Sequence, residues 1–118
     1  MASEIHTNVS LSVVKGGAKT NRVESVSIDM SGDSLTHGVQ GIPTGGEVLV
    51  ESDELGTAGL CFIKNLDTDN YVTVGSHQTD NHTIKLKAGE SSLFRAAGSV
   101  YAMANTAACN VEYIIIED

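Results

Sequence analysis

The sequence has few of the residues that usually fill a large core. Among 118 residues there is no tryptophan, and there are two phenylalanines, three tyrosines and a single proline. A chain of this length fits one domain and buries about two-thirds of the surface that its unfolded form exposes. A thin core built from valine, isoleucine, leucine and alanine suits β-strands. We expect such a chain to gain stability by association.

Positive charge is also scarce, because seven lysines and arginines face fifteen acidic residues and the formal net charge is −8. Such a surface repels phosphate backbones, which argues against nucleic acid as a partner. Three of the cations, Lys15, Lys19 and Arg22, lie within eight residues of one another. This spacing predicts a solvated loop, which could still meet an acidic partner.

Two kinds of hydrophobic segment are missing. The first six residues have neither a basic stretch nor an apolar stretch, so we expect no signal peptide and synthesis in a cytoplasm. The longest aliphatic run is Ile114-Ile115-Ile116, which is far too short to cross a membrane. The two cysteines, Cys61 and Cys109, lie in strand-like runs, and without a secretory signal they are predicted to be reduced and buried.

What the sequence does contain is alternation of apolar and polar residues. Period-two patterns indicate half-buried strands, and they occur over residues 5–14, 23–30, 35–40, 47–52, 59–65, 71–75, 82–86, 91–95, 99–104 and 109–117. Short strands at this spacing, with no amphipathic helix, predict an all-β fold. The expected architecture is a single antiparallel β-sandwich or jelly-roll-like domain of about nine or ten strands. We assign residues 1–22 to an N-terminal arm and residues 23–118 to the sandwich.

Residues 56–74 stand out within this pattern. Two apolar runs, 59–65 and 71–75, flank a loop that is rich in asparagine and aspartate. These two residue types favour turns, so the pattern predicts a β-hairpin with a medium-length loop. The last run, 109–117, is apolar on both faces near its end, which indicates a strand that is central in the sandwich or covered by another subunit.

No arrangement of residues points to catalysis, and neither an enzyme activity nor a cofactor is expected. His77 and His82 flank a loop with Asp80 and form a weak candidate for a metal site, but polar turn residues explain them as well. Asp67 and Asp69 resemble the start of a calcium loop. However, the later ligand positions do not follow, so turn capping is the preferred interpretation.

A series of short segments over about the last two-thirds of the chain carries a further signal: LGTAG at 55–59, IKNLD at 63–67, NYV at 70–72, VG at 74–75, LKAGE at 86–90, LFR at 93–95, YAMANTAA at 101–108, VEYII at 111–115 and ED at 117–118. With these segments the chain resembles a group of small virion structural proteins of tailed bacteriophages. The better understood small β-sandwich members of such groups are head decoration, or cement, proteins. The resemblance therefore implies a homotrimeric, jelly-roll-like protein on the head surface of the virion, with the major capsid protein as its partner.

Within this interpretation two surfaces are assigned. Tyr113, Ile114 and Ile116 on the final strand are the expected interface between copies, and Lys15, Lys19 and Arg22 are the expected capsid contact. Two alternatives remain open. The protein is another virion component of the tail, neck or head fibre, or it is a non-catalytic β-sandwich module that binds carbohydrate or calcium.

Overall fold

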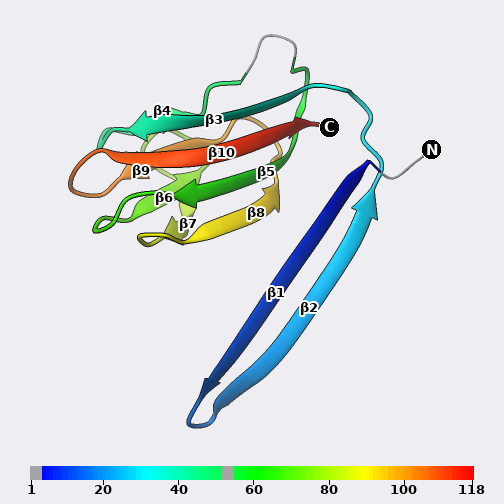
Figure 1. Ribbon diagram of the computed structural model, residues 1–118. Helices are drawn as coiled ribbons and strands as arrows, with labels where there is room; N and C mark the ends of the chain where they lie inside the picture. Colours follow the sequence, from blue (N-terminus) through cyan, green and yellow to red (C-terminus); the bar gives the residue numbers. More distant parts are fainter. Residues whose placement is uncertain (1–3, 52–54) are drawn as a thin grey trace. The chain divides into compact units, whose positions relative to one another are not determined.

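The computed structural model describes residues 4–51 and 55–118, and over these residues it contains ten β-strands and no helix (Figure 1). The prediction of an all-β, antiparallel fold is confirmed. The strands are β1 Ile5–Lys15, β2 Ala18–Ile28, β3 Leu35–Ile42, β4 Glu47–Val48, β5 Ala58–Asn65, β6 Val72–Gly75, β7 His82–Leu86, β8 Ser91–Arg95, β9 Tyr101–Ala104 and β10 Cys109–Glu117.

The chain divides into two compact units, Met1–Ser31 and Gly32–Asp118. In the first unit β1 and β2 pair with each other over their whole length, from Ile5 opposite Ile28 to Lys15 opposite Ala18. We call this element the hairpin. Only Gly16 and Gly17 lie between its strands, and Gly16 has a φ of +57°, which a residue without Cβ adopts at little cost.

The predicted boundary at residue 22 differs from this division, because residues 22 and 23 both lie inside β2. The alternating run 23–30 reads as the first strand of a sandwich, but its strand begins at Ala18 and pairs only with β1. The tight glycine turn is the reason, since a two-residue turn brings the following residues directly alongside the preceding strand.

The second unit contains two four-stranded antiparallel sheets, with strand orders β3-β10-β5-β8 and β4-β9-β6-β7 (Figure 1). The pairings are nested along the chain: β3 pairs with β10, β4 with β9, β5 with β8 and β6 with β7. Double-sheet jelly rolls pair their strands in this nested way. The two sheets form a sandwich-like arrangement around one core.

The core of this unit is aliphatic, as the composition indicates. Each strand contributes alternate residues to it, so on β10 the side chains of Cys109, Val111, Tyr113 and Ile115 are buried while the intervening residues point outward. β10 lies between β3 and β5 in this sheet, and near its end its outward side chains, Ile114 and Ile116, are apolar as well.

The prediction of a β-hairpin over residues 56–74 is wrong. β5 pairs with β10 and β8 in one sheet, whereas β6 pairs with β7 and β9 in the other. The loop between them therefore carries the chain from one sheet to the other. The strand predicted over 47–52 is also shorter than expected, because β4 covers only Glu47 and Val48, and residue 52 lies outside the described residues.

Candidate functional site

The register of the first sheet places three apolar side chains and one histidine in a row on its outer face. Ile114 of β10 lies opposite His37 of β3 and Phe62 of β5, and Phe62 lies opposite Leu93 of β8. Directly paired residues of antiparallel strands share one face of the sheet. These four side chains thus lie side by side across the whole sheet, on the face away from the core.

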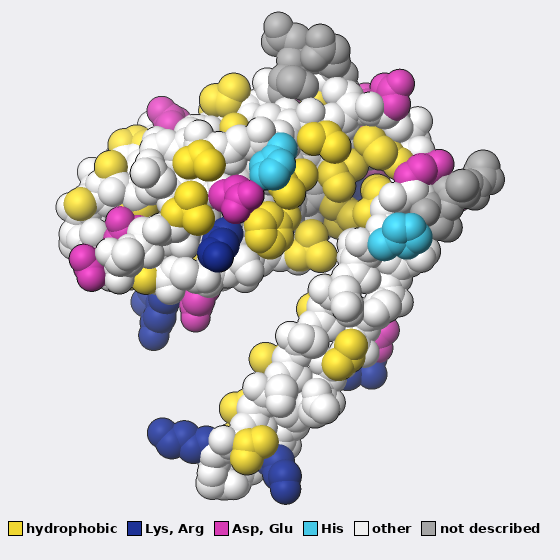
Figure 2. Space-filling view, in the orientation of Figure 1, with side chains coloured by type: hydrophobic (Ala, Val, Ile, Leu, Met, Phe, Trp, Pro, Cys, Tyr) yellow, Lys and Arg dark blue, Asp and Glu magenta, His cyan; other side chains and the backbone are white. Residues whose placement is uncertain are grey.

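Further apolar residues lie next to this row and extend it into a patch. Ile116 lies opposite Leu35, and Val39 lies opposite Glu112. We call the set the outer-face patch; its members are Leu35, Val39, Phe62, Leu93, Ile114 and Ile116. Leu35 and Val39 are 53% and 62% exposed. Figure 2 shows hydrophobic side chains gathered over the face formed by these strands.

A patch of this kind is unusual for an antiparallel sheet. The outward face of such a sheet is normally polar where it meets water. Contiguous apolar surface rimmed by polar groups is instead typical of a protein interaction site. The outer-face patch is therefore the strongest candidate for a functional surface in the described part of the second unit.

Charged groups on the same face are balanced in sign. His37 Nε2 lies 2.9 Å from Glu112 Oε2, and Lys64 lies opposite Glu112 in the strand register. At the end of the sheet, Arg95 Nη1 donates a hydrogen bond of 2.6 Å to Asp118 Oδ1. The face carries two permanent cations beside two carboxylates, although the whole chain carries a net charge of −8. It can therefore approach another protein surface with less repulsion than the rest of the molecule.

The structure separates the three residues predicted as an interface between copies. Ile114 and Ile116 are half-buried on the outer face and belong to the patch. Tyr113 points the other way: it is 4% exposed within the core, and its hydroxyl donates a 2.8 Å hydrogen bond to the carbonyl of Val50. Tyr113 is thus a core residue and no interface anchor, because the period of a strand turns adjacent side chains to opposite faces.

Sequence reasoning did not find the patch members outside β10. Neither Phe62 nor any of Leu35, Val39 and Leu93 is singled out from the sequence. A signal was present on β5, where Phe62 alternates with Cys61 and Ile63, so that the strand is apolar on both faces. The others required the strand order, because they come from three different parts of the chain.

Of the cations predicted as a capsid contact, Lys15 and Lys19 lie at the turn end of the hairpin, whereas Arg22 lies near the middle of β2. Lys15 ends β1, and Lys19 and Arg22 lie in the first half of β2, so they do not form the loop that the sequence suggested. The guanidinium of Arg22 forms an ion pair with Glu24. No acidic residue occurs between residues 15 and 22, which leaves this end of the hairpin positively charged.

The acidic loop after β5 is organised by hydrogen bonds within the chain. Asp67 Oδ2 accepts the backbone N–H groups of Asp69 and Asn70 at 2.9 and 2.6 Å. These bonds, with that of Asn70 first, hold the pKa of the Asp67 carboxyl below its usual value. The carboxylate of Asp67 therefore caps a turn.

The two histidines proposed beside Asp80 are also held by neighbours. His82 Nδ1 lies 2.8 Å from Thr73 Oγ1, and its Nε2 lies 2.7 Å from the carbonyl oxygen of His77. The His77 ring bonds instead to Ser76 and Asn81. Over residues 4–51 and 55–118, no three histidine, cysteine, aspartate or glutamate side chains are grouped so that they could hold a metal ion.

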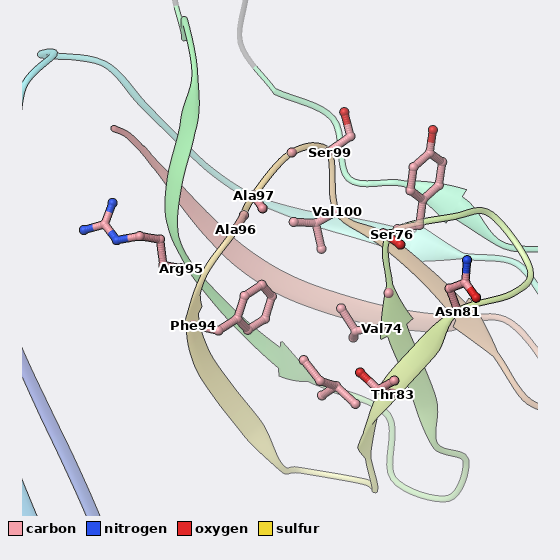
Figure 3. A pocket seen from close by; sticks show the side chains of 14 residues that line it. Val74, Ser76, Asn81, Thr83, Phe94, Arg95, Ala96, Ala97, Ser99 and Val100 are labelled. Carbon is pink, nitrogen blue, oxygen red and sulfur yellow. The ribbon is translucent and has the colours of Figure 1, made fainter.

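A cavity of about 460 Å³ opens at one end of the sandwich, where β6, β7 and β9 meet the end of β8. In Figure 3 the side chains of Phe94, Val74 and Val100 point into it, while Arg95 points away. No carboxylate lines this cavity, and its lining contains no nucleophile with an adjacent base.

Both cysteines are free and buried, as predicted. Burial raises the pKa of the Cys61 thiol to about 12 and also raises that of Cys109. Because the thiolate is the reactive form and both thiols are buried, we expect neither residue of the native protein to react with Ellman's reagent at pH 8. Both should react once guanidinium unfolds the chain. Rapid reaction of one thiol in the native state would contradict this prediction.

No family model, curated protein or solved structure matches the chain significantly. The described residues include no helix long and apolar enough to span a membrane.

Proposed function

We propose that this protein is a structural subunit of a bacteriophage virion, and specifically a capsid decoration protein. In this role it binds the outer surface of the head as a symmetric oligomer, expected to be a homotrimer, and stabilises the shell through contact with the major capsid protein. The observation that carries the proposal is the outer-face patch, since a decoration protein needs no reactive group but does need surfaces that bind. The resemblance of residues 55–118 to phage virion proteins supports the same role.

The outer-face patch is assigned to contacts between copies, through Ile114 and Ile116 and their apolar neighbours. The positively charged end of the hairpin is assigned to the capsid. A protein that binds the assembled shell and not its loosened form stabilises the shell by mass action. The gain is about 3 to 4 kcal/mol per site when free protein exceeds its dissociation constant by about 100- to 1,000-fold.

The direct test adds purified protein to purified empty heads and, separately, to tails, and then sediments each mixture. We expect the protein to pellet with heads at a fixed ratio to the major capsid protein and to stay in solution with tails. Binding to tails alone would place it elsewhere in the virion. Binding to neither particle would overturn the proposed function.

The capsid contact makes a second prediction. The double substitution Lys15→Glu and Lys19→Glu reverses two charges at the end of the hairpin, and we expect it to weaken head binding by at least about 10-fold at 0.15 M salt. Its matched control is Lys85→Glu with Lys87→Glu, which changes the net charge equally at β7 and the residue after it. Equal loss of binding in the two variants would show a general effect of charge and no contact at the hairpin.

A further inference from the structure

The hairpin has two unlike faces. In its register, Ile5, Val9, Leu11 and Val13 of β1 share one face with the residues opposite them, which include Val26 and Ile28 of β2. We call this side the apolar face. The other side is mainly polar, although it also carries the exposed Val14 and Val23; its remaining members are His6, Asn8, Ser10, Ser12, Lys19, Asn21, Ser25 and Ser27.

The apolar face has no cover within the hairpin itself. Val9 is 52% exposed, Leu11 63%, Val13 40% and Val26 49%. An isolated two-stranded hairpin is only marginally stable in water, and it needs further strands or a packed face to become stable. We therefore expect a partner to cover the apolar side of this hairpin, whose two strands have eleven residues each.

Charge identifies a second copy of the same element as the partner. Residues 1–31 contain three basic and three acidic side chains and are neutral, whereas residues 32–118 contain four basic and twelve acidic side chains and carry the whole net charge of −8. The hairpins of two copies therefore meet without the repulsion that the net charge of the second units creates. Near the middle of the apolar face, Arg22 and Glu24 form an ion pair with each other, so two copies of this part of the face add no unbalanced charge to a contact.

We propose that the hairpins of neighbouring copies pack against each other through their apolar faces. β1 and β2 pair without a bulge, so the face is regular. In the homotrimer of the proposed function the three apolar faces turn toward the shared axis, and each contacts the faces of its two neighbours. The footprint of each apolar face, about 35 Å long and about 10 Å wide, falls short of the roughly 800 Å² per partner of a standard stable interface. The hairpin contact therefore acts together with the outer-face patch, and this inference rests on the oligomer of the proposed function.

The first test compares two neighbouring positions on β1. Leu11 lies on the apolar face and Ser10 on the polar face, and both are exposed. We expect Leu11→Asp to raise the concentration at which the oligomer dissociates by at least about 10-fold, because it removes one of two linked contacts. We expect Ser10→Asp, which adds the same charge, to leave that concentration unchanged within about twofold. Light scattering over a dilution series gives both values.

The second test introduces no charge, so it is informative even if an aspartate on the apolar face unfolds the hairpin. Single cysteines are placed at the same two positions, and the oligomer is treated with diamide, which oxidises pairs of nearby thiols to disulfides. The native cysteines are buried and do not interfere. We expect Leu11→Cys chains to cross-link into dimers at least about 10-fold faster than Ser10→Cys chains, since only the first pair of thiols meets in the interface.

The outcomes separate this inference from the proposed function. Equal cross-linking of the two cysteine variants, or no cross-linking of Leu11→Cys in a sample that light scattering shows to be oligomeric, overturns the hairpin contact. If that same sample still binds heads, the proposed function stands. A wild-type protein that is monomeric at all concentrations overturns both the hairpin contact and the expected symmetric oligomer.

Discussion

Replacing Asn65 with alanine is expected to lower the free energy of unfolding by about 3 kcal/mol. Asn65 is completely buried at the end of β5, and its side chain joins three backbone groups. Its Nδ2 donates to the carbonyls of Asn70 and Leu86 at 2.9 and 3.1 Å, and its Oδ1 accepts the N–H of Asp67 at 2.9 Å. The amide therefore fixes the loop that crosses between the sheets and ties it to the end of β7.

The cost is large because alanine leaves those backbone groups without partners in a place that water does not easily reach. For a unit of this size the change corresponds to a melting temperature lower by about 10 °C or more. Denaturant unfolding, followed at one protein concentration, measures it.

The matched control is Asn105→Ala, which removes the same amide from an exposed position. Asn105 Oδ1 accepts one hydrogen bond, from the N–H of Tyr71 at 3.1 Å, and solvent can replace it. We expect a loss of less than about 1 kcal/mol. Equal losses at Asn65 and Asn105 would show that the buried amide does not organise the crossing loop.

Ile114→Asp is expected to convert the proposed oligomer into folded monomers of 12.3 kDa. Ile114 lies in the middle of the outer-face patch, between His37 and Phe62. Enclosing an aspartate there when copies associate would remove its carboxylate from water without a matching partner. A cost of about 3 kcal/mol corresponds to a dissociation constant raised by about 100-fold. Light scattering at a fixed concentration reports the mass.

The control for this variant is Asn110→Asp on the same strand. Asn110 lies on the same face as Ile114, is exposed, and receives the same charge, but it is not a member of the patch. We expect its oligomer mass to equal that of the wild type. Circular dichroism of both variants should retain the β-sheet spectrum, because neither side chain belongs to the core. An oligomer mass of Ile114→Asp equal to that of the wild type would contradict the assignment of the patch to contacts between copies.

The prediction of strands succeeded where the signal is local. The alternation of buried and exposed residues is a property of each strand alone, so its period reveals strands such as β7 and β10 without knowledge of their neighbours. The same reasoning failed for the pairing of β5 with β6. Both strands have apolar residues that point inward, and a loop rich in turn-forming residues joins them. Two paired strands of a hairpin and two strands in facing sheets have this same pattern, so the sequence does not distinguish them.

The candidate surface was predicted only in part for a related reason. Ile114 and Ile116 were recognised because they interrupt the alternation of a single strand. Leu35, Val39 and Leu93 are ordinary apolar residues in their own segments, and they become a patch only when β3, β10, β5 and β8 lie side by side. The prediction of Tyr113 as an interface residue was wrong because alternation separates the two faces of a strand but does not reveal which face points into the core.

By itself, the sequence determined the all-β class, the positions of most strands, the excess of acidic residues and the burial of both cysteines. These follow from composition and from period-two patterning, which act within a few residues. Tertiary structure decided the pairing of strands, the separate hairpin, the burial of Asn65 and the assembly of the outer-face patch. These depend on contacts between residues far apart in the chain, such as Leu35 with Ile116, which no local pattern encodes.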